Sequence, residues 1–168
     1  MADLVFDTSV LSDLLVQYFE FDVIRRGYFV PRGNLSNELV KHINRIIKYH
    51  SDTIFDDEIS PGLVVASVLA FVEIARKFDV LSCGKYSIAK FAAFIESPPD
   101  WFKISPLDMD ILSYLNEIPI IVRGDGGGSL ELADAVHVAT ALSREKFYVV
   151  TTDARIRALE LLNNKIIS

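Results

Sequence analysis

Short, mainly apolar runs alternate with longer segments of helical periodicity along most of this chain, and this alternation constrains the fold more than any other feature. The runs at 4–6, 63–66, 101–104 and 147–150 predict buried strands, and a last short strand is expected at 165–167. Most of these runs are followed by segments with apolar residues three, four and seven positions apart. Strands joined by helices require right-handed crossovers, so we expect an α/β fold with a central, mainly parallel sheet.

Capping residues indicate where the helices begin. Ser36 and Ser67 each precede an amphipathic segment, and serine is a preferred residue just before a helix. Ser105 precedes Pro106, and proline is favoured in the first helical turn. We expect helices at 10–19, from Ser36, at 67–78, 85–95, 105–115, 129–143 and 153–162, with a flexible glycine-rich loop at 123–128.

Length and composition favour one domain with a substantial core, since 51% of the 168 residues are hydrophobic. The 17 basic and 23 acidic residues give a net charge of −6, which argues against a nucleic-acid binder that depends on bulk positive charge but leaves room for a local basic groove. Cys83 has no second cysteine to pair with, which favours a reducing compartment. The N-terminus does not resemble a signal peptide, and no apolar run reaches membrane-spanning length, so we expect a cytoplasmic protein without a membrane partner.

Four acidic residues stand at informative positions. In a parallel sheet, ligands gather outside the carboxyl ends of the strands. Asp7 directly follows the strand expected at 4–6, and Asp153 follows the strand expected at 147–150 after two threonines. Glu73 and Asp134 lie inside mainly apolar helical segments. We therefore expect these carboxylates to converge at one edge of the sheet.

Each acid taken alone has a simpler explanation. Asp7 and Asp153 would serve as helix N-caps. Glu73 would lie on a solvent-facing stripe shared with Arg76, and Asp134 would be an acid favoured in a first helical turn by the helix dipole. The set favours a site, because four clustered carboxylates repel and raise one another's pKa values unless a cation is present. Mg²⁺ or Mn²⁺, which prefer oxygen ligands, would relieve that repulsion.

The motifs around these acids resemble those of a known family. In chain order, FDTSVL, AFVEIARKF, ADAVHVATAL and YVVTTDARI resemble the acidic motifs of the PIN domain, the fold of VapC-like toxin ribonucleases and related nucleases. The resemblance extends over nearly the whole chain. It implies a single PIN-like domain over 1–168, a three-layer α/β/α sandwich, and an acidic metal site at Asp7, Glu73, Asp134 and Asp153. The position of Asp153 is the most variable of these in the family.

The resemblance implies a metal-dependent endoribonuclease, with the toxin of a type II toxin–antitoxin pair as one version. Asp7 and Asp134 would bind a first Mg²⁺ or Mn²⁺, and Asp153 would complete the site directly or through water. Glu73 would bind a second ion or orient water. Activated water would attack in line and leave a 5′-phosphate, so DNA is not chemically excluded. A cognate antitoxin and a homodimer are the partners that the family implies.

Hydroxyl groups and a histidine accompany the acids. Thr8, Ser9, Thr151 and Thr152 are expected to bond ligand carboxylates or phosphate, although Thr8 and Ser9 would equally serve as capping residues. His137 follows Asp134 by three residues, so the two lie on neighbouring parts of one helix face. We expect His137 not to be a ligand, because a Mg²⁺ site prefers oxygen.

Basic residues suggest where RNA would bind. The segment 21–60 lengthens the connection between Asp7 and Glu73 and is expected to be a helical insertion. Single-stranded RNA is recognised by positive charge interleaved with planar groups. Lys41, Arg45 and Lys48 provide the charge here, with an ordinary solvated helix face as an equal alternative. Arg123 and Arg155 stand beside the acidic motifs and are alternative phosphate contacts.

Two other functions would use some of the same acids. A haloacid-dehalogenase-like phosphatase, which is a metal-dependent enzyme, also needs an acid two residues after the first aspartate, and Ser9 occupies that position. A non-catalytic PIN-like RNA-binding or scaffold protein usually loses one or more of the acids, and all four are present. The nuclease is therefore the favoured interpretation of the sequence.

Overall fold

A computed structural model describes residues 1–20, 23–52, 62–77 and 87–168 of the chain. Cys83, the expected helix start at 85–86 and the later part of the expected insertion lie outside the described residues. Within the described ranges no helix is long and apolar enough to cross a membrane.

A five-stranded parallel sheet forms the centre of the fold, as the alternating sequence pattern predicted. Its strand order is β3-β2-β1-β6-β7. The strands are β1 (Asp3–Phe6), β2 (Val64–Ser67), β3 (Phe102–Ser105), β6 (Phe147–Val150) and β7 (Ile166–Ile167). In the register of the sheet, Phe6 pairs with Ala66 on one side and with Val150 on the other. Asp7 and Thr151 therefore leave the sheet side by side at its carboxyl edge.

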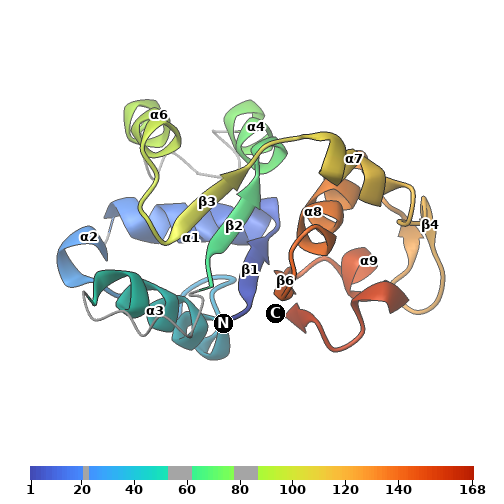
Figure 1. The fold of residues 1–168 in the computed structure, drawn as a ribbon, viewed down its shortest axis with the longest axis horizontal. Helices are drawn as coiled ribbons and strands as arrows, with labels where there is room; N and C mark the ends of the chain where they lie inside the picture. Colours follow the sequence, from blue (N-terminus) through green and yellow to red (C-terminus); the bar gives the residue numbers. More distant parts are fainter. Residues whose placement is uncertain (21–22, 53–61, 78–86) are drawn as a thin grey trace.

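Helices cover both faces of this sheet (Figure 1). Leu4 and Phe6 contribute to one apolar cluster, whereas Val5 between them contributes to the other, because successive strand residues point to opposite faces. Side chains of α1, α3, α4 and α6 belong to the first cluster, and side chains of α7 and α8 belong to the second. The helices are α1 (Thr8–Glu20), α2 (Val23–Arg26), α3 (Asn37–Ser51), α4 (Val68–Arg76), α6 (Ile88–Glu96), α7 (Met109–Leu115), α8 (Leu132–Leu142) and α9 (Ala154–Arg157).

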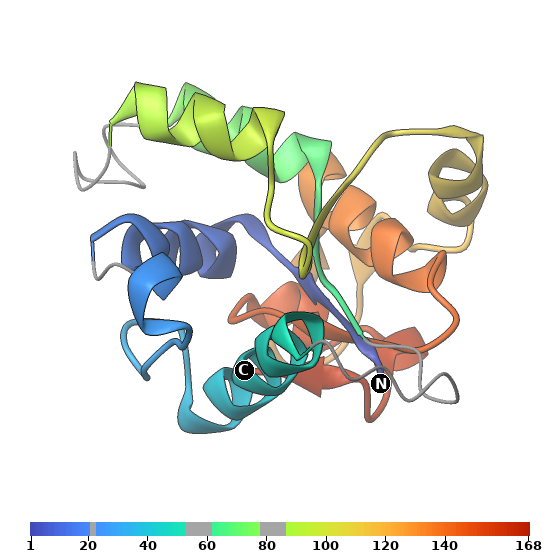
Figure 2. The same cartoon turned by 60° about the vertical axis from the view of Figure 1, so that its left-hand side comes forward.

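Two of the predicted serine caps are confirmed. The hydroxyl of Ser36 accepts a hydrogen bond from the N–H of Leu39 at the start of α3, and that of Ser67 accepts one from Ala70 at the start of α4. The helix α4 then runs beside α6 (Figure 2), where Phe71 packs against the rings of Phe91 and Phe94. These contacts fix the direction of α4, the helix that carries Glu73.

The expected helix starts at Ser105 and Ser129 are wrong. Ser105 is the last residue of β3, where it pairs with Ser67, and α7 begins only at Met109. Asp108 caps α7 by accepting a hydrogen bond from the N–H of Ile111 at 3.1 Å. The helix expected at 153–162 is also divided, because α9 ends at Arg157 and a separate 3-10 turn spans Glu160–Leu162.

The glycine tract, predicted as a flexible loop at 123–128, forms the turn of a short hairpin. The strands β4 (Ile121–Val122) and β5 (Gly128–Ser129) pair antiparallel, so Ser129 belongs to a strand and α8 begins at Leu132. Gly124 and Gly126 adopt φ values of 96° and 78° in the turn, and residues other than glycine rarely adopt this backbone conformation. The hairpin delivers the chain to the start of α8, the helix that carries Asp134.

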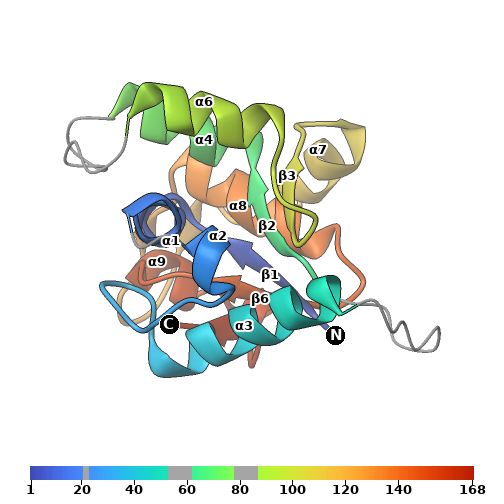
Figure 3. The same cartoon turned by 90° about the vertical axis from the view of Figure 1, so that its left-hand side faces the viewer.

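The segment 21–60 contributes α2 and α3 among the described residues. Apolar residues of α3, including Leu39, Ile43 and Ile46, are buried in the first cluster. Figure 3 shows α3 beside the amino-terminal end of β1, and His50 Nε2 near its end lies 3.1 Å from the carbonyl oxygen of Gly62. The end of α3 is thus at the opposite edge of the sheet from Asp7.

Candidate functional site

The four predicted acids line one pocket of about 310 Å³ at the carboxyl edge of the sheet. Asp7 follows β1, Glu73 projects from α4, Asp134 lies in the first turn of α8, and Asp153 precedes α9. Chain segments that are far apart in sequence therefore supply the four carboxylates. The other lining residues are Thr8, Ser9, Lys77, Glu131, His137, Thr152 and Arg155.

Lys77 and Glu131 were missed by the sequence analysis. Lys77 follows Glu73 by four residues and Glu131 precedes Asp134 by three, so each stands one helical turn from a predicted acid. This helical spacing was the signal that would have placed both of them at the same pocket.

Asp7 is both a helix cap and a pocket residue. Its side chain is buried, and Oδ1 accepts hydrogen bonds from Ser9 Oγ and from the N–H of Val10, each at 2.9 Å. Oδ2 accepts a hydrogen bond from the hydroxyl of Thr151, which is fully buried. The capping interpretation is thus confirmed without removing Asp7 from the site, because the same contacts hold the carboxylate rigidly at the pocket wall.

Glu73 points into the pocket, so the interpretation of it as a solvent-facing residue is wrong. Its Oε2 accepts a hydrogen bond from the hydroxyl of Thr8, and His137 Nε2 lies 3.5 Å from the same oxygen. The side chain of Glu73 is 22% exposed, whereas Arg76 on the same helix faces solvent.

His137 is buried behind Glu73 and is occupied on both ring nitrogens. Nδ1 lies 3.0 Å from Ser67 Oγ and Nε2 lies 3.1 Å from Thr8 Oγ1. Because Thr8 gives its only hydroxyl proton to Glu73, it must accept from His137, which assigns the ring proton to Nε2. His137 therefore positions Thr8 and Glu73 in this geometry.

Asp134 and Asp153 share a cation from within the chain. Arg155 Nη2 lies 2.7 Å from Asp153 Oδ2 and 3.2 Å from Asp134 Oδ2. Asp153 also caps α9, since its Oδ1 accepts a hydrogen bond from the N–H of Arg155 at 2.7 Å. Arg155 was expected to contact phosphate, and in this structure it contacts carboxylates.

The acids do not raise one another's pKa values uniformly, which corrects the expectation from the sequence. Burial raises the pKa of Asp134. The side-chain hydrogen bond from Arg155 lowers the pKa of Asp153, and the hydrogen bond from His137 lowers the pKa of Glu73. Internal donors thus keep Asp153 and Glu73 ionised, and Asp134 is the carboxylate with the least compensation of these three.

The remaining sequence candidates differ in their distance from the acids. Thr152 is exposed at the pocket rim, and Ser9 bonds Asp7. Arg123 lines a separate hollow of about 640 Å³ with Pro119 and Leu161. Lys41, Arg45 and Lys48 are exposed on α3 and none of them lines the acidic pocket.

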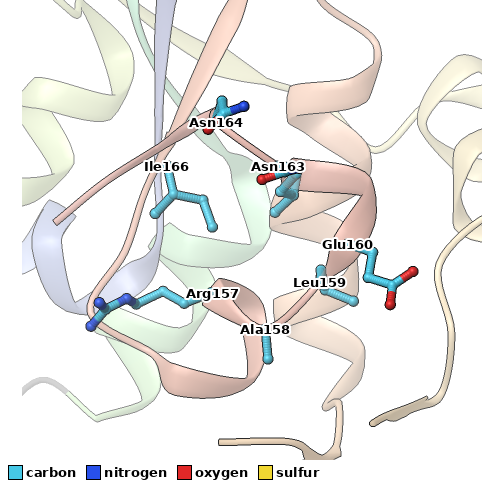
Figure 4. Close-up of a pocket in the computed structure, with 8 residues that line it drawn as sticks. Arg157, Ala158, Leu159, Glu160, Asn163, Asn164 and Ile166 are labelled. Carbon is cyan, nitrogen blue, oxygen red and sulfur yellow. The ribbon is translucent and has the colours of Figure 1, made fainter. Parts of the chain in front are cut away.

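A larger hollow of about 660 Å³ lies beside the 3-10 turn (Figure 4). Arg157, Glu160, Asn163 and Asn164 are its polar lining residues. Figure 4 shows the side chains of Arg157 and Glu160 extending away from each other. Of its described lining residues only Glu160 carries a carboxylate, so the convergence of acidic groups seen in the smaller pocket is not found among them.

The donor set of the acidic pocket fits a hard divalent cation. Carboxylate oxygens, the ligands that Mg²⁺ and Mn²⁺ prefer, come from several sides, and one positive group of the chain already stands among them. Within the described ranges, no three acidic or histidine side chains lie close enough together to form a ready-made metal centre. The guanidinium of Arg155 contacts both Asp134 and Asp153.

Comparisons with protein-family models, with curated proteins and with solved structures found no match to this chain.

Proposed function

We propose that this chain is a PIN-like, divalent-metal-dependent endoribonuclease. The observation that supports this most strongly is the convergence of Asp7, Glu73, Asp134 and Asp153 on one pocket from separate segments. Capping explains Asp7 and Asp153, and also Asp134, whose Oδ2 accepts a hydrogen bond from the N–H of Glu131 at 3.4 Å. It does not explain why Glu73, which caps no helix, faces the same space as these three acids. Grouped carboxylates of this kind are stabilised by a cation.

The chain's own groups would divide the work as follows. Asp7 and Asp134 would hold the first Mg²⁺ or Mn²⁺, with Asp153 completing the site directly or through water. When bound, divalent ions would supply positive charge that neutralises the phosphate and lowers the pKa of attacking water. Glu73 would hold a second ion or orient the water, and its Oε1 has no hydrogen-bond partner among the described residues.

Rim cations would contact the nucleic acid. Lys77 lines the pocket, where its charge acts on Glu73, and its ammonium group would contact a phosphate bound at the rim. Single-stranded RNA fits an open pocket of this size better than a duplex, because a single strand can bend its backbone toward the acids. Lys41, Arg45 and Lys48 would then contact the strand at a distance from the cleaved bond.

The family resemblance adds two partners to the proposal. In a toxin–antitoxin pair, a cognate antitoxin would insert a segment into the acidic pocket, and the chain would form a homodimer. Size-exclusion chromatography with light scattering on the purified chain tests the homodimer.

Cleavage of end-labelled RNA tests the proposed function. Single-stranded and structured RNA are incubated with the protein in Mg²⁺, Mn²⁺ or EDTA. We expect cleavage in either metal and none in EDTA, and a loss of at least about 100-fold in Asp7→Asn and Asp134→Asn, because each change removes a charged metal ligand. The 5′-phosphate of the product is detected by its susceptibility to a 5′-phosphate-dependent exonuclease.

Asp110→Asn is the matched control, since Asp110 is an exposed acid in the first turn of α7 and does not line the pocket. It should cleave like the wild type. RNA binding without cleavage in either metal would favour the non-catalytic PIN-like protein, and cleavage that persists in both pocket variants would contradict the proposal.

A further inference from the structure

Arg155 makes a side-on, two-point contact with Asp153. Its Nε lies 3.2 Å from Oδ1 and its Nη2 lies 2.7 Å from Oδ2. The same Nη2 reaches Asp134 Oδ2 at 3.2 Å. One nitrogen of the guanidinium therefore bridges Asp134 in the first turn of α8 and Asp153, the residue that caps α9. This planar, two-point geometry is specific to arginine, because a lysine ammonium is a single point charge.

The carboxylates that Arg155 bridges, Asp134 and Asp153, are two of those that would hold a divalent cation in the proposed site. A guanidinium and a divalent ion of the same sign repel strongly at a few ångströms, most of all in a partly buried site. Arg155 contacts both oxygens of Asp153 and one oxygen of Asp134, so a divalent ion held by these two carboxylates would compete with the guanidinium for them.

The Arg155 side chain would move only a short distance, from the acids to the pocket rim, when it is displaced. It is 31% exposed, and its other contacts are at the rim, where Nη1 donates to the carbonyl oxygen of Ser129 at 3.1 Å and lies 3.9 Å from Glu131 Oε1. The guanidinium can thus leave the acids and remain at the mouth of the pocket. There it would meet the phosphate that the metal attracts, and guanidinium groups bind phosphate with the same two-point geometry.

We propose that Arg155 is the internal counter-ion of the acidic pocket, that a divalent metal ion displaces it from Asp134 and Asp153, and that the released guanidinium then contacts substrate phosphate. This inference rests on the proposed function for its metal site and for its last step. It links metal binding to substrate binding, because the positive group reaches the phosphate only after the metal has taken its place.

Mn²⁺ binding to the metal-free full chain, measured by isothermal titration calorimetry, tests the competition without any cleavage assay. Arg155→Gln removes the competing charge, and we expect its Mn²⁺ affinity to rise roughly ten-fold above wild type. Arg157→Gln is the matched control, because Arg157 lies two residues further along α9, is exposed and does not line the acidic pocket. Its affinity should stay within about two-fold of wild type.

An unchanged or weaker Mn²⁺ affinity in Arg155→Gln would overturn the inference and leave Arg155 as a structural clamp between α9 and the hairpin. If Arg155→Gln does not fold, Arg155→Lys replaces it. The lysine variant loses the two-point contact and should still bind Mn²⁺ more tightly than wild type, so an unchanged affinity overturns the inference here too.

Cleavage at saturating Mn²⁺ tests the last step. We expect Arg155→Gln to cleave RNA about ten-fold more slowly than Arg157→Gln, mainly through a higher KM. Tighter Mn²⁺ binding without cleavage by any form would support the counter-ion role and contradict the nuclease. Normal cleavage by wild type, together with unchanged Mn²⁺ affinity in Arg155→Gln, would support the nuclease and contradict the counter-ion role. If no form binds Mn²⁺, both the nuclease and the counter-ion role are overturned.

Discussion

Two polar clusters of this protein begin on the same helix, α1, and are built in opposite ways. At its start, Thr8 and Ser9 belong to the acidic pocket. Further along, Gln17 pairs with both backbone groups of Val30, donating to its carbonyl oxygen and accepting from its N–H, each at 2.7 Å. Asn44 on α3 makes the same two-way contact with Phe29.

The difference between the clusters is one of balance. In the amide cluster each donor and acceptor named has a partner in the backbone, and no net charge is present. Among the described residues, the acidic pocket is lined by five carboxylates and by the positively charged side chains of Lys77 and Arg155. A neutral cluster whose polar groups are all hydrogen-bonded contributes to folding. A partly buried cluster with uncompensated charge is unfavourable unless a further group compensates that charge. This imbalance separates a candidate site from a structural network of similar polarity.

Breaking the amide cluster should cost the most stability. Gln17 is 2% exposed, and Gln17→Ala would leave the N–H and carbonyl of Val30 unpaired while opening a cavity. We expect a loss of about 3 kcal/mol in the free energy of unfolding, measured with urea. Mn²⁺ affinity should stay within about two-fold of wild type, because the contacts of the acidic pocket are separate.

Lys41→Ala on the exposed face of α3 controls for a truncation that removes no buried hydrogen bond. Its free energy of unfolding should change by less than about 0.5 kcal/mol. A large fall in Mn²⁺ affinity in Gln17→Ala would show that the two clusters are one network and that the comparison is mistaken.

Thr151 forms hydrogen bonds with two acidic residues of the pocket, Asp7 and Asp153. Its hydroxyl donates to Asp7 Oδ2 and accepts from the N–H of Asp153 at 3.0 Å. Thr151→Val keeps the shape and removes both bonds, so we expect a loss of about 1.5 kcal/mol in stability. Mn²⁺ affinity should fall roughly ten-fold, since groups that orient ligands typically have effects of this size.

Thr140→Val provides the comparison, because Thr140 is also fully buried but its hydroxyl donates to the carbonyl oxygen of Val136 within α8. It should leave Mn²⁺ affinity unchanged. Equal effects of the two substitutions on metal affinity would mean that Thr151 acts through general packing rather than through Asp7.

The sequence pattern predicted those features that depend on neighbouring residues or on the direction of strands. The parallel sheet follows from alternation, and the convergence of Asp7 and Asp153 follows from the rule that parallel strands end at one edge. The start of α7 could not be settled locally, because Ser105 and Asp108 are both good caps. Pairing of Ser105 with Ser67 across the sheet decides between them.

The contacts among the site residues could not be predicted from sequence patterns. Arg155 has an obvious neighbour in Asp153, but its contact with Asp134 depends on how α8 and α9 pack. The orientation of Glu73 likewise depends on Thr8 and His137, which come from other segments. Helical periodicity places a residue on a face, and the tertiary fold decides what that face meets.

The smallest predicted effect concerns the contribution of Asp134 to the stability of the folded protein. Burial raises its pKa above the ordinary aspartate value of about 3.9, so the folded protein holds this proton more tightly than the unfolded chain. Stability from that proton is complete below the unfolded pKa and is lost as pH rises through the folded pKa. Asp134→Asn has no carboxyl group at this position, so its stability does not fall in this way as pH rises. At pH 7 in EDTA it should unfold at equal or higher free energy, by about 1 kcal/mol at most.

Asp153→Asn should show the opposite sign. The hydrogen bond from Arg155 lowers the pKa of Asp153, so its stabilisation is present above the unfolded pKa and is lost as pH falls through the folded one. Urea unfolding of both variants and wild type at several pH values between about 3 and 7 measures the two trends. If both substitutions destabilise the protein at pH 7, Arg155 compensates Asp134 as fully as Asp153, and the pocket is then closer in balance to the amide cluster than its charges suggest.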